Sequence, residues 1–131
     1  MSVISASPEA PAAATAVIVA GNEETRVLLR GLVRLQHFHV VGESEGSTEA
    51  LHLLREHRPS LVLIETGLAE GSAAALLQAA HALLPASRLV VVGPLDPQGG
   101  APTRGERITY LRKPFRIAEF AQAIGREPPP A

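Results

Sequence analysis

The sequence predicts an α/β domain in which five parallel strands form a doubly wound sheet of order 2-1-3-4-5. Five short apolar runs alternate with segments of helical periodicity. The runs are continuous, which is typical of strands buried on both faces, whereas half-exposed strands alternate apolar and polar residues. Right-handed crossovers between such strands give the doubly wound arrangement. At 131 residues the chain is long enough for one packed core.

The composition excludes several classes of protein. With 46% hydrophobic and 19% charged residues the chain is globular. A net charge of -1 gives no electrostatic basis for binding nucleic acid or a membrane surface. The chain has no cysteine, and no apolar run approaches the ~20 residues that span a bilayer. We therefore expect a cytoplasmic protein whose partners are other proteins or a second copy of itself.

The third strand is the element around which the chain is organised. Leu61–Ile64 is a run of four apolar residues that follows Pro59 and leads into Glu65 and then Gly67. Open α/β sheets place their chemistry at the carboxyl ends of the strands. Glu65 is therefore the first candidate functional residue.

The other elements follow from turn signals and periodicity. Acids open the first helix, Ser47 or Thr48 is expected to cap the second, and Gly71 with Ser72 starts the third. The remaining strands are expected at 16–20, 38–42, 89–92 and 108–111, and the helices at 23–37, 47–58, 72–84 and 117–124. The last helix is expected to bury Ile117, Phe120, Ala121 and Ile124.

Residues 93–106 break the alternation of strand and helix. They hold three prolines and four glycines, and an interior proline costs a helix ~3 kcal/mol and a glycine ~1 kcal/mol. A full helix is therefore not expected there. Residues 1–15 are predicted to be a flexible tail, 16–126 the folded domain, and 127–131 a proline-rich tail or the start of a linker.

The first helix carries more apolar residues than a core stripe needs. Six of them cover an arc of about 240°, against the ~100° of a core stripe: Val27, Leu28, Leu29, Leu32, Val33 and Leu35. Leu29 and Val33 are expected to lie outside the main core contact and to border a solvated arginine face. They are the candidate interface for a homodimer or a protein partner. The alternative is that a neighbouring helix covers them.

Five segments give the chain a resemblance to the receiver domains of two-component response regulators, over roughly residues 16–126. The most specific is Lys113–Phe115, because Lys113 is the only lysine of the chain. The matching segments are Val17–Val19, Val40–Glu43, Glu49–Leu51, Arg58–Ile64 and Lys113–Phe115. The resemblance implies the flavodoxin-like receiver fold with its fourth helix degraded. The segment 40–51 looks most like receivers attached to a helix-turn-helix output domain.

The resemblance also implies a set of site residues. Receivers hold a phosphoacceptor Asp at the end of the third strand, which is Glu65 here. Their Mg²⁺-binding acidic pair falls on Gly21 and Asn22, their hydroxyl position on Gly93 and their lysine on Lys113. Three of these four catalytic features are therefore changed.

The changes predict a degenerate receiver that does not use phosphate. Glu65 extends about one bond, ~1.5 Å, further than Asp, and a Glu65–Lys113 ion pair could imitate the phosphorylated state. Tyr110 stands where receivers place their switch aromatic, but Gly93 offers it no hydroxyl. We expect no catalytic residue, no metal and no cofactor, and hence a signalling module rather than an enzyme.

Two alternatives remain open from the sequence. One is a working phosphoacceptor that uses Glu65, with Glu23 and Mg²⁺ at the site. The other is a module that binds a small molecule in the vacated acidic pocket. The histidines show no spacing typical of metal ligands.

Overall fold

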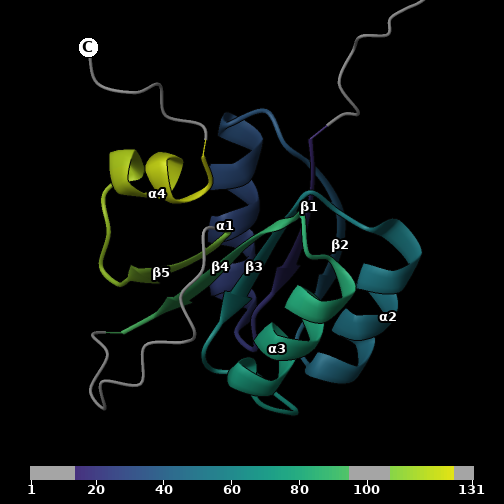
Figure 1. Cartoon of the computed structure of the whole chain (residues 1–131). Coiled ribbons are helices and arrows are strands. Elements are labelled where there is room, and N and C mark those ends of the chain that lie inside the picture. The colour runs from purple at the N-terminus through teal and green to yellow at the C-terminus, as the bar shows by residue number, and fades with distance from the viewer. Residues whose placement is uncertain (1–13, 95–106, 126–131) are drawn as a thin grey trace, which may run out of the picture.

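Five parallel strands form one sheet of order β2-β1-β3-β4-β5 in the computed structural model, which describes residues 14–94 and 107–125. Figure 1 shows β3 in the middle of the sheet, paired with β1 and β4. The predicted fold class and strand order are confirmed. The strands are β1 Thr15–Val19, β2 His39–Ser44, β3 Leu61–Glu65, β4 Arg88–Gly93 and β5 Ile108–Arg112.

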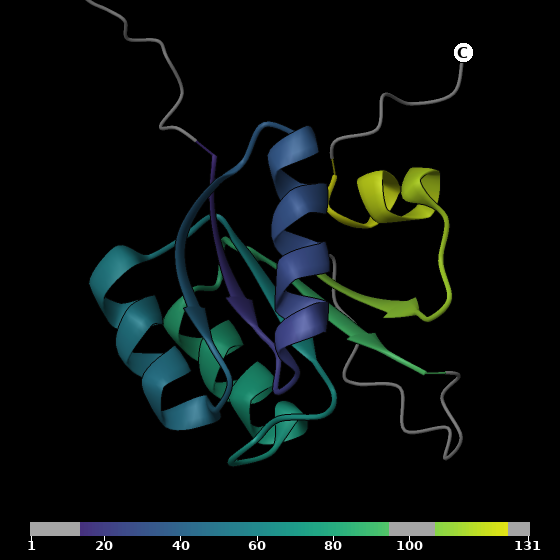
Figure 2. The ribbon, with the colours of Figure 1, turned by 180° about the vertical axis from the view of Figure 1, so that it is seen from behind.

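Four helices within the described residues cover the two faces of the sheet. Figures 1 and 2 show α1 and α4 side by side on one face, with α2 and α3 on the other. No helix in this part of the chain is long and apolar enough to cross a membrane. The helices are α1 Glu23–Leu35, α2 Ser47–His57, α3 Ala73–Leu83 and α4 Ile117–Ala123.

Several expectations fall mainly on residues that the structure does not describe. The expected tails at 1–15 and 127–131 lie almost wholly outside the described ranges. The expected loss of the receiver's fourth helix falls on 93–106, of which only 93 and 94 are described. These expectations stay predictions.

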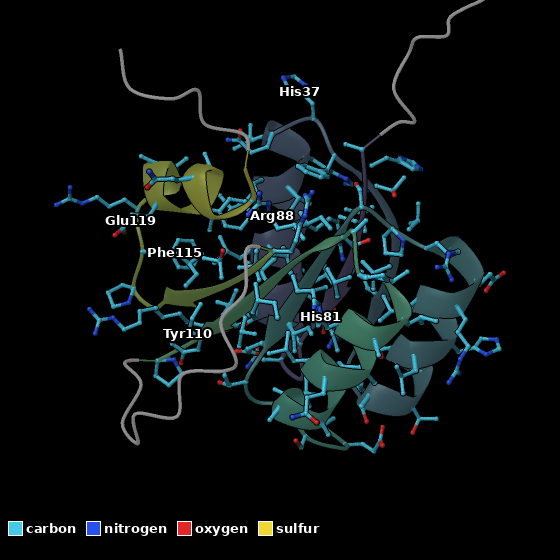
Figure 3. All side chains as sticks on the ribbon, in the orientation of Figure 1. His37, His81, Arg88, Tyr110, Phe115 and Glu119 are labelled. Carbon is cyan, nitrogen blue, oxygen red and sulfur yellow. The ribbon has the colours of Figure 1, made fainter. Side chains whose placement is uncertain are left out.

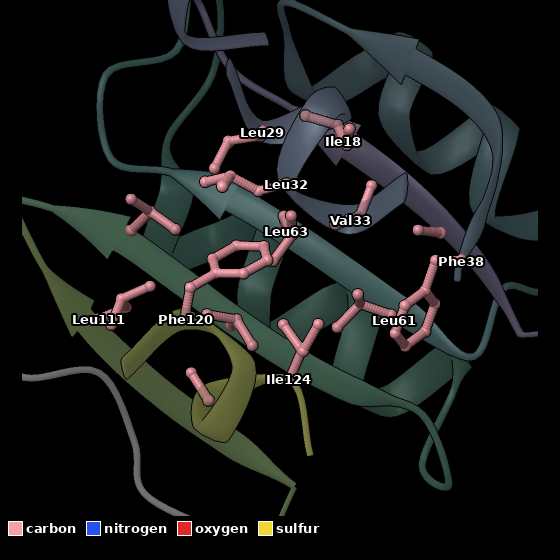
Figure 4. Close-up of a cluster of buried hydrophobic side chains, with 14 residues drawn as sticks. Ile18, Leu29, Leu32, Val33, Phe38, Leu61, Leu63, Leu111, Phe120 and Ile124 are labelled. Carbon is pink, nitrogen blue, oxygen red and sulfur yellow. The ribbon is translucent and has the colours of Figure 1, made fainter. Parts of the chain in front are cut away.

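The core consists of two apolar layers separated by the sheet. All five residues of β3 are buried, because helices cover both faces of this central strand. One layer joins the strands to α1 and α4, and Figure 4 shows Leu29, Leu32 and Val33 pointing from α1 toward Phe120 within it. The other layer joins the strands to α2 and α3.

The expected orientation of α1 is wrong. Leu29 and Val33, expected outside the main core contact, are fully buried, so they are core residues and not an interface. The three residues expected to share the core face with Leu32 are exposed instead: Val27 (50%), Leu28 (55%) and Leu35 (65%).

Two arginines explain this rotation of α1. Arg26 and Arg30 were expected on a solvated face, but both are half-buried. Arg26 donates to the carbonyl oxygen of Ala20 at 2.6 Å, and Arg30 donates to Glu43 on β2 at 2.6 Å. This bond to Glu43 raises the pKa of Arg30. Because both side chains reach toward the sheet, Leu29 and Val33, which follow Arg26 and Arg30 by three positions on the same side of the helix, also face inward.

The helix starts agree with the sequence in two of three cases. The side chains of Asn22 and Ser72 accept hydrogen bonds from the first turns of α1 and α3. The cap of α2 is Gly46, with no side-chain bond, so the expected Ser47 or Thr48 cap is wrong. Ile117, expected to be buried, is 59% exposed.

Candidate functional site at the carboxyl ends of the strands

Glu65 and Lys113 form an ion pair at the carboxyl edge of the sheet. Glu65 ends β3 and is 8% exposed, and the Lys113 ammonium donates to its Oε2 at 2.9 Å. The backbone amide of Lys113 donates to the carbonyl of Gly93 at 2.6 Å, which fixes the start of the loop after β5. The hydroxyl of Thr25 donates to the same Oε2 at 3.4 Å. One carboxylate oxygen is therefore already occupied by a cation and a hydroxyl of the chain itself.

Within the described part of the chain, the other carboxylate oxygen of Glu65 has no hydrogen-bond partner. Its Oε1 is buried, and no hydrogen bond reaches it from the described residues. A buried acceptor without a hydrogen bond costs about 1–3 kcal/mol. It is the acceptor of this carboxylate that the described residues leave without a hydrogen bond.

Gly21 lies against the loop that follows β3. Its amide donates to the carbonyl of Gly67 at 3.0 Å. A Cβ atom at position 21 would clash with that carbonyl oxygen and lie 2.9 Å from the amide nitrogen of Ala69. The backbone of this loop therefore occupies the space that an acidic side chain at position 21 would need.

The neighbouring residues do not supply a replacement for the acidic pair. The side-chain oxygen of Asn22 accepts from the amide of Thr25 at 3.2 Å as the cap of α1. Glu23 is exposed and helps to raise the pKa of Arg30. No group of three His, Cys, Asp or Glu within 14–94 and 107–125 could hold a metal ion. Since Mg²⁺ needs near-octahedral oxygen ligands, this donor set does not fit the ion that receivers use.

The space at Gly93 is filled by two hydroxyl-bearing side chains. A Cβ atom at position 93 would lie 2.7 Å from Thr66 Cγ2 and 3.0 Å from the Tyr110 hydroxyl oxygen. That hydroxyl donates to the carbonyl of Pro94 at 2.9 Å. A threonine or serine at position 93 would displace both neighbours.

No protein-family model matches the chain, and no curated protein matches it. Solved structures do match. A CheY-like receiver from Methylobacillus flagellatus superposes with a TM-score of 0.71 at 24% identity, over 85% of this chain and 95% of that one. The receiver of PhyR from Erythrobacter litoralis gives 0.73 at 19% identity, over 91% and 96%. RcsB from Salmonella enterica serovar Typhimurium, bound to a promoter, gives 0.71 at 15%, over 86% and 66%.

The chain has the receiver fold. The strand order and the helices on both faces agree with these structures, and the identities below 25% extend the likeness to the fold alone. The structure brings Glu65, Lys113 and Gly93 together at the carboxyl edge of the sheet, and Gly21 contacts the loop that follows β3. Asn22 and Glu23 are not brought into contact with the Glu65 carboxylate.

Glu70 ties the loop that follows β3 to the start of α2. Its carboxylate accepts from the amide and the hydroxyl of Thr48 at 3.0 and 2.9 Å, and from the hydroxyl of Ser47 at 3.2 Å. The bond from the Thr48 amide lowers the pKa of Glu70. Gly46 and Glu70 also form an isolated β-bridge. The loop after β3 is thus tied to the start of α2.

Sequence reasoning missed four residues that shape this pocket. Thr25 and Thr66 contribute hydroxyl groups, Gly67 its carbonyl and Glu70 its carboxylate. An acid just before a glycine is a turn signal, but nothing in the sequence indicates that Glu70 reaches α2.

An apolar groove lies beside the pocket, between α1 and the loop after β5. Its volume is about 620 Å³. Phe115, which Figure 3 shows between α4 and β5, stacks on Phe120 with ring centroids 5.8 Å apart. The groove is lined by Leu28, Leu32, Pro94, Lys113, Pro114, Phe115 and Ile117.

Proposed function

We propose that the protein is a phosphorylation-independent pseudo-receiver that acts as a protein-interaction module in signalling. The observation that carries this proposal is the 2.9 Å ion pair between Glu65 and Lys113 in a pocket without an acidic pair. In a phosphorylated receiver the lysine binds the phosphoryl group. Here the lysine is bound to the carboxylate that would have to accept it.

The ion pair supports a constant state of the receiver rather than a switch. Glu65 is shielded from solvent, so its attraction to Lys113 is screened less than that of a surface pair. The backbone of Lys113 is held by Gly93. Tyr110 is held by the carbonyl of Pro94, which takes the place of the hydroxyl that a receiver offers at position 93.

The closed loop argues against the working phosphoacceptor and the acidic-pocket ligand. Both alternatives depend on the acidic pocket, and at position 21 the loop after β3 fills that space, with the amide of Gly21 donating to the carbonyl of Gly67. The phosphoacceptor also needs Mg²⁺, for which the surrounding oxygen donors are too few. The one observation in favour of the phosphoacceptor is that Oε1 of Glu65 has no hydrogen-bond partner among the described residues.

Intact mass after incubation with acetyl phosphate and Mg²⁺ tests the proposal. The wild type should show no added phosphoryl group, and Glu65→Asp should show none either, because the metal-binding acids are missing as well. Glu65→Gln is the matched control for labelling at other sites. A phosphoryl group on the wild type that is absent from Glu65→Gln would overturn the proposal.

The signalling role has two possible arrangements: a separate module, or the input domain of a transcription regulator. The segment 40–51 resembles receivers joined to a helix-turn-helix, and RcsB is a promoter-binding protein with this fold. Sequencing the reading frame beyond Ala131 distinguishes the two. A helix-turn-helix there supports the regulator, and a stop codon supports the separate module.

A further inference from the structure

The groove between α1 and the loop after β5 has the size and the lining of a small-molecule site. Its volume of about 620 Å³ lies within the range of ~300–1,000 Å³ that is typical of ligand pockets. Lys113 is the only charged residue of the lining, and every other lining residue is apolar. An apolar lining with one or a few polar groups is typical of sites for organic molecules.

The walls of this groove are held in place by contacts within the chain. Phe115 stacks on Phe120, which is fully buried. Leu32, on the α1 side, is 8% exposed, and Figure 4 shows it in the same core layer as Phe120. The backbone amide of Lys113 donates to the carbonyl of Gly93 at 2.6 Å. The groove is therefore formed before a ligand binds, and little conformational entropy is lost in ordering it.

The Lys113 ammonium keeps hydrogen-bonding capacity for a ligand. An ammonium group has three N–H donors, and among the described residues only Glu65 accepts from it, at 2.9 Å. The lysine side chain is 36% exposed, so water can reach the remaining donors. A hydrocarbon placed over Lys113 would remove this water without replacing its hydrogen bonds, which is unfavourable. A ligand that carries an acceptor oxygen replaces one of them.

The charges at Lys113 favour an uncharged ligand. The Glu65 carboxylate already compensates the charge of Lys113, and its Oε1 has no hydrogen-bond partner among the described residues. A carboxylate on the ligand would share the ammonium with Glu65 and be repelled by it. An amine on the ligand would be repelled by Lys113 in the same way. A neutral carbonyl group accepts from the ammonium and meets neither repulsion.

We propose that this groove binds an uncharged, largely apolar organic molecule through one carbonyl group, whose oxygen accepts from the Lys113 ammonium. The hydrocarbon part of the ligand lies against Leu28, Phe115 and Ile117. The site is separate from the vacated acidic pocket, where the loop after β3 fills the space at position 21. It adds a small-molecule ligand to the proposed interaction module. The two proposals can fail separately, because ligand binding is measured without phosphodonor or Mg²⁺.

Amide NMR titration of the full chain with four probes built on one naphthalene ring tests the ligand class. The probes are 2-acetylnaphthalene, naphthalene, 2-naphthoate and 2-naphthylmethylamine. The ketone should give saturable shifts at Lys113, Phe115 and Ile117, with Kd below about 1 mM. It should bind at least about tenfold more tightly than each of the other three probes, because only the ketone supplies a neutral acceptor for the ammonium.

Two exposed leucines of α1 give a matched pair of variants that locates the site. Leu28 lines the groove and is 55% exposed, whereas Leu35 is 65% exposed and lies outside the lining. Leu28→Glu should weaken binding of the ketone at least about tenfold, because it places a charge in the apolar lining. Leu35→Glu should bind the ketone like the wild type. Both variants should fold, since neither side chain belongs to the core.

Lys113→Met tests the role of the ammonium. The variant should still bind naphthalene but lose its preference for the ketone over naphthalene, because the donor is gone. Lys113→Met with Glu65→Gln serves the same purpose if the single variant fails to melt cooperatively. A lysine that only supports the wall of the groove would change the affinity for both probes equally.

Four results would overturn the proposal. The first is a wild type without saturable shifts for the ketone, and the second is tighter binding of the acid or the amine than of the ketone. The third is a Leu28→Glu variant that binds like the wild type, or an equal loss in Leu35→Glu. The fourth is a variant without the Lys113 ammonium that keeps the preference for the ketone.

Discussion

The carboxyl end of β3 and the outer face of α1 differ in whether their side chains have partners within the molecule. At the end of β3, polar groups bind one another: Lys113 forms an ion pair with Glu65, and the Gly21 amide donates to the carbonyl of Gly67. On α1, apolar residues remain exposed without an internal partner. The chain's own groups thus occupy the carboxyl end of β3, whereas the outer face of α1 keeps its apolar side chains exposed.

Two adjacent leucines give the largest test of this comparison. Leu29 is fully buried, whereas Leu28 is 55% exposed. Leu29→Glu should cost more than about 4 kcal/mol, because it buries a charge without a partner, and should unfold the chain. Leu28→Glu should change the free energy of unfolding by less than about 1 kcal/mol. Urea denaturation compares them, and similar stability of the two variants would contradict the described orientation of α1.

Gly21→Asp breaks the closed region directly. The new side chain would clash with the carbonyl of Gly67, and overpacking of this kind costs about 1–3 kcal/mol. The melting temperature should fall, and adding Mg²⁺ should not restore it. Gly31→Asp is a control for adding aspartate at an open glycine, since nothing surrounds that position. A variant that gains stability with Mg²⁺ would show that the loop opens easily.

Lys113→Met measures how strongly the closed region depends on its ion pair. The substitution leaves Glu65 buried with only Thr25 as a hydrogen-bond partner. The free energy of unfolding should fall by about 1–2 kcal/mol. This is less than for a fully buried pair, because Lys113 is partly exposed. Adding Glu65→Gln should recover part of the loss. Arg112→Met, at an exposed neighbour, is the control and should be nearly neutral. Chemical denaturation at neutral pH gives all four values.

The smallest expected effect concerns Glu70, which ties the closing loop to α2. The pKa of Glu70 is lowered from 4.5 by the bond from the Thr48 amide. A carboxyl with a lowered folded pKa contributes stability that is complete above its unfolded pKa and is lost as the pH falls through the folded value. Glu70→Gln should therefore melt slightly below the wild type at pH 7. The difference should vanish as the pH falls well below 4.5, and a difference that grows in acid would contradict this role.

The sequence predicted the sheet better than it predicted α1. Continuous apolar runs such as Leu61–Ile64 indicate buried strands when they are short and bounded by Pro or Gly, because both faces of such a strand are covered. In α1 apolar residues cover too wide an arc for periodicity to fix which side faces the sheet. The deciding contacts, Arg26 to Ala20 and Arg30 to Glu43, join different elements and are visible only after folding.

The candidate site likewise has residues that the sequence could locate and contacts that it could not. The residues at strand ends, Glu65, Gly93 and Lys113, could be located because the fold fixes where strands end. The closure of the pocket could not be predicted, because it depends on the path of one loop. Two hydrogen bonds between distant parts of the chain set that path. The Thr48 amide, at the start of α2, donates to Glu70, and the Gly21 amide donates to the carbonyl of Gly67.

The most direct test of the central claim, that the end of β3 is closed to phosphate chemistry, is a titration of the amide NMR spectrum with beryllofluoride and Mg²⁺. We predict that the resonances of Gly21, Glu65, Gly67 and Lys113 stay unchanged at millimolar concentrations of both. Saturable shifts at these residues, with a coupled shift at Tyr110, would contradict the account, because they would show that the pocket opens and binds a phosphoryl analogue.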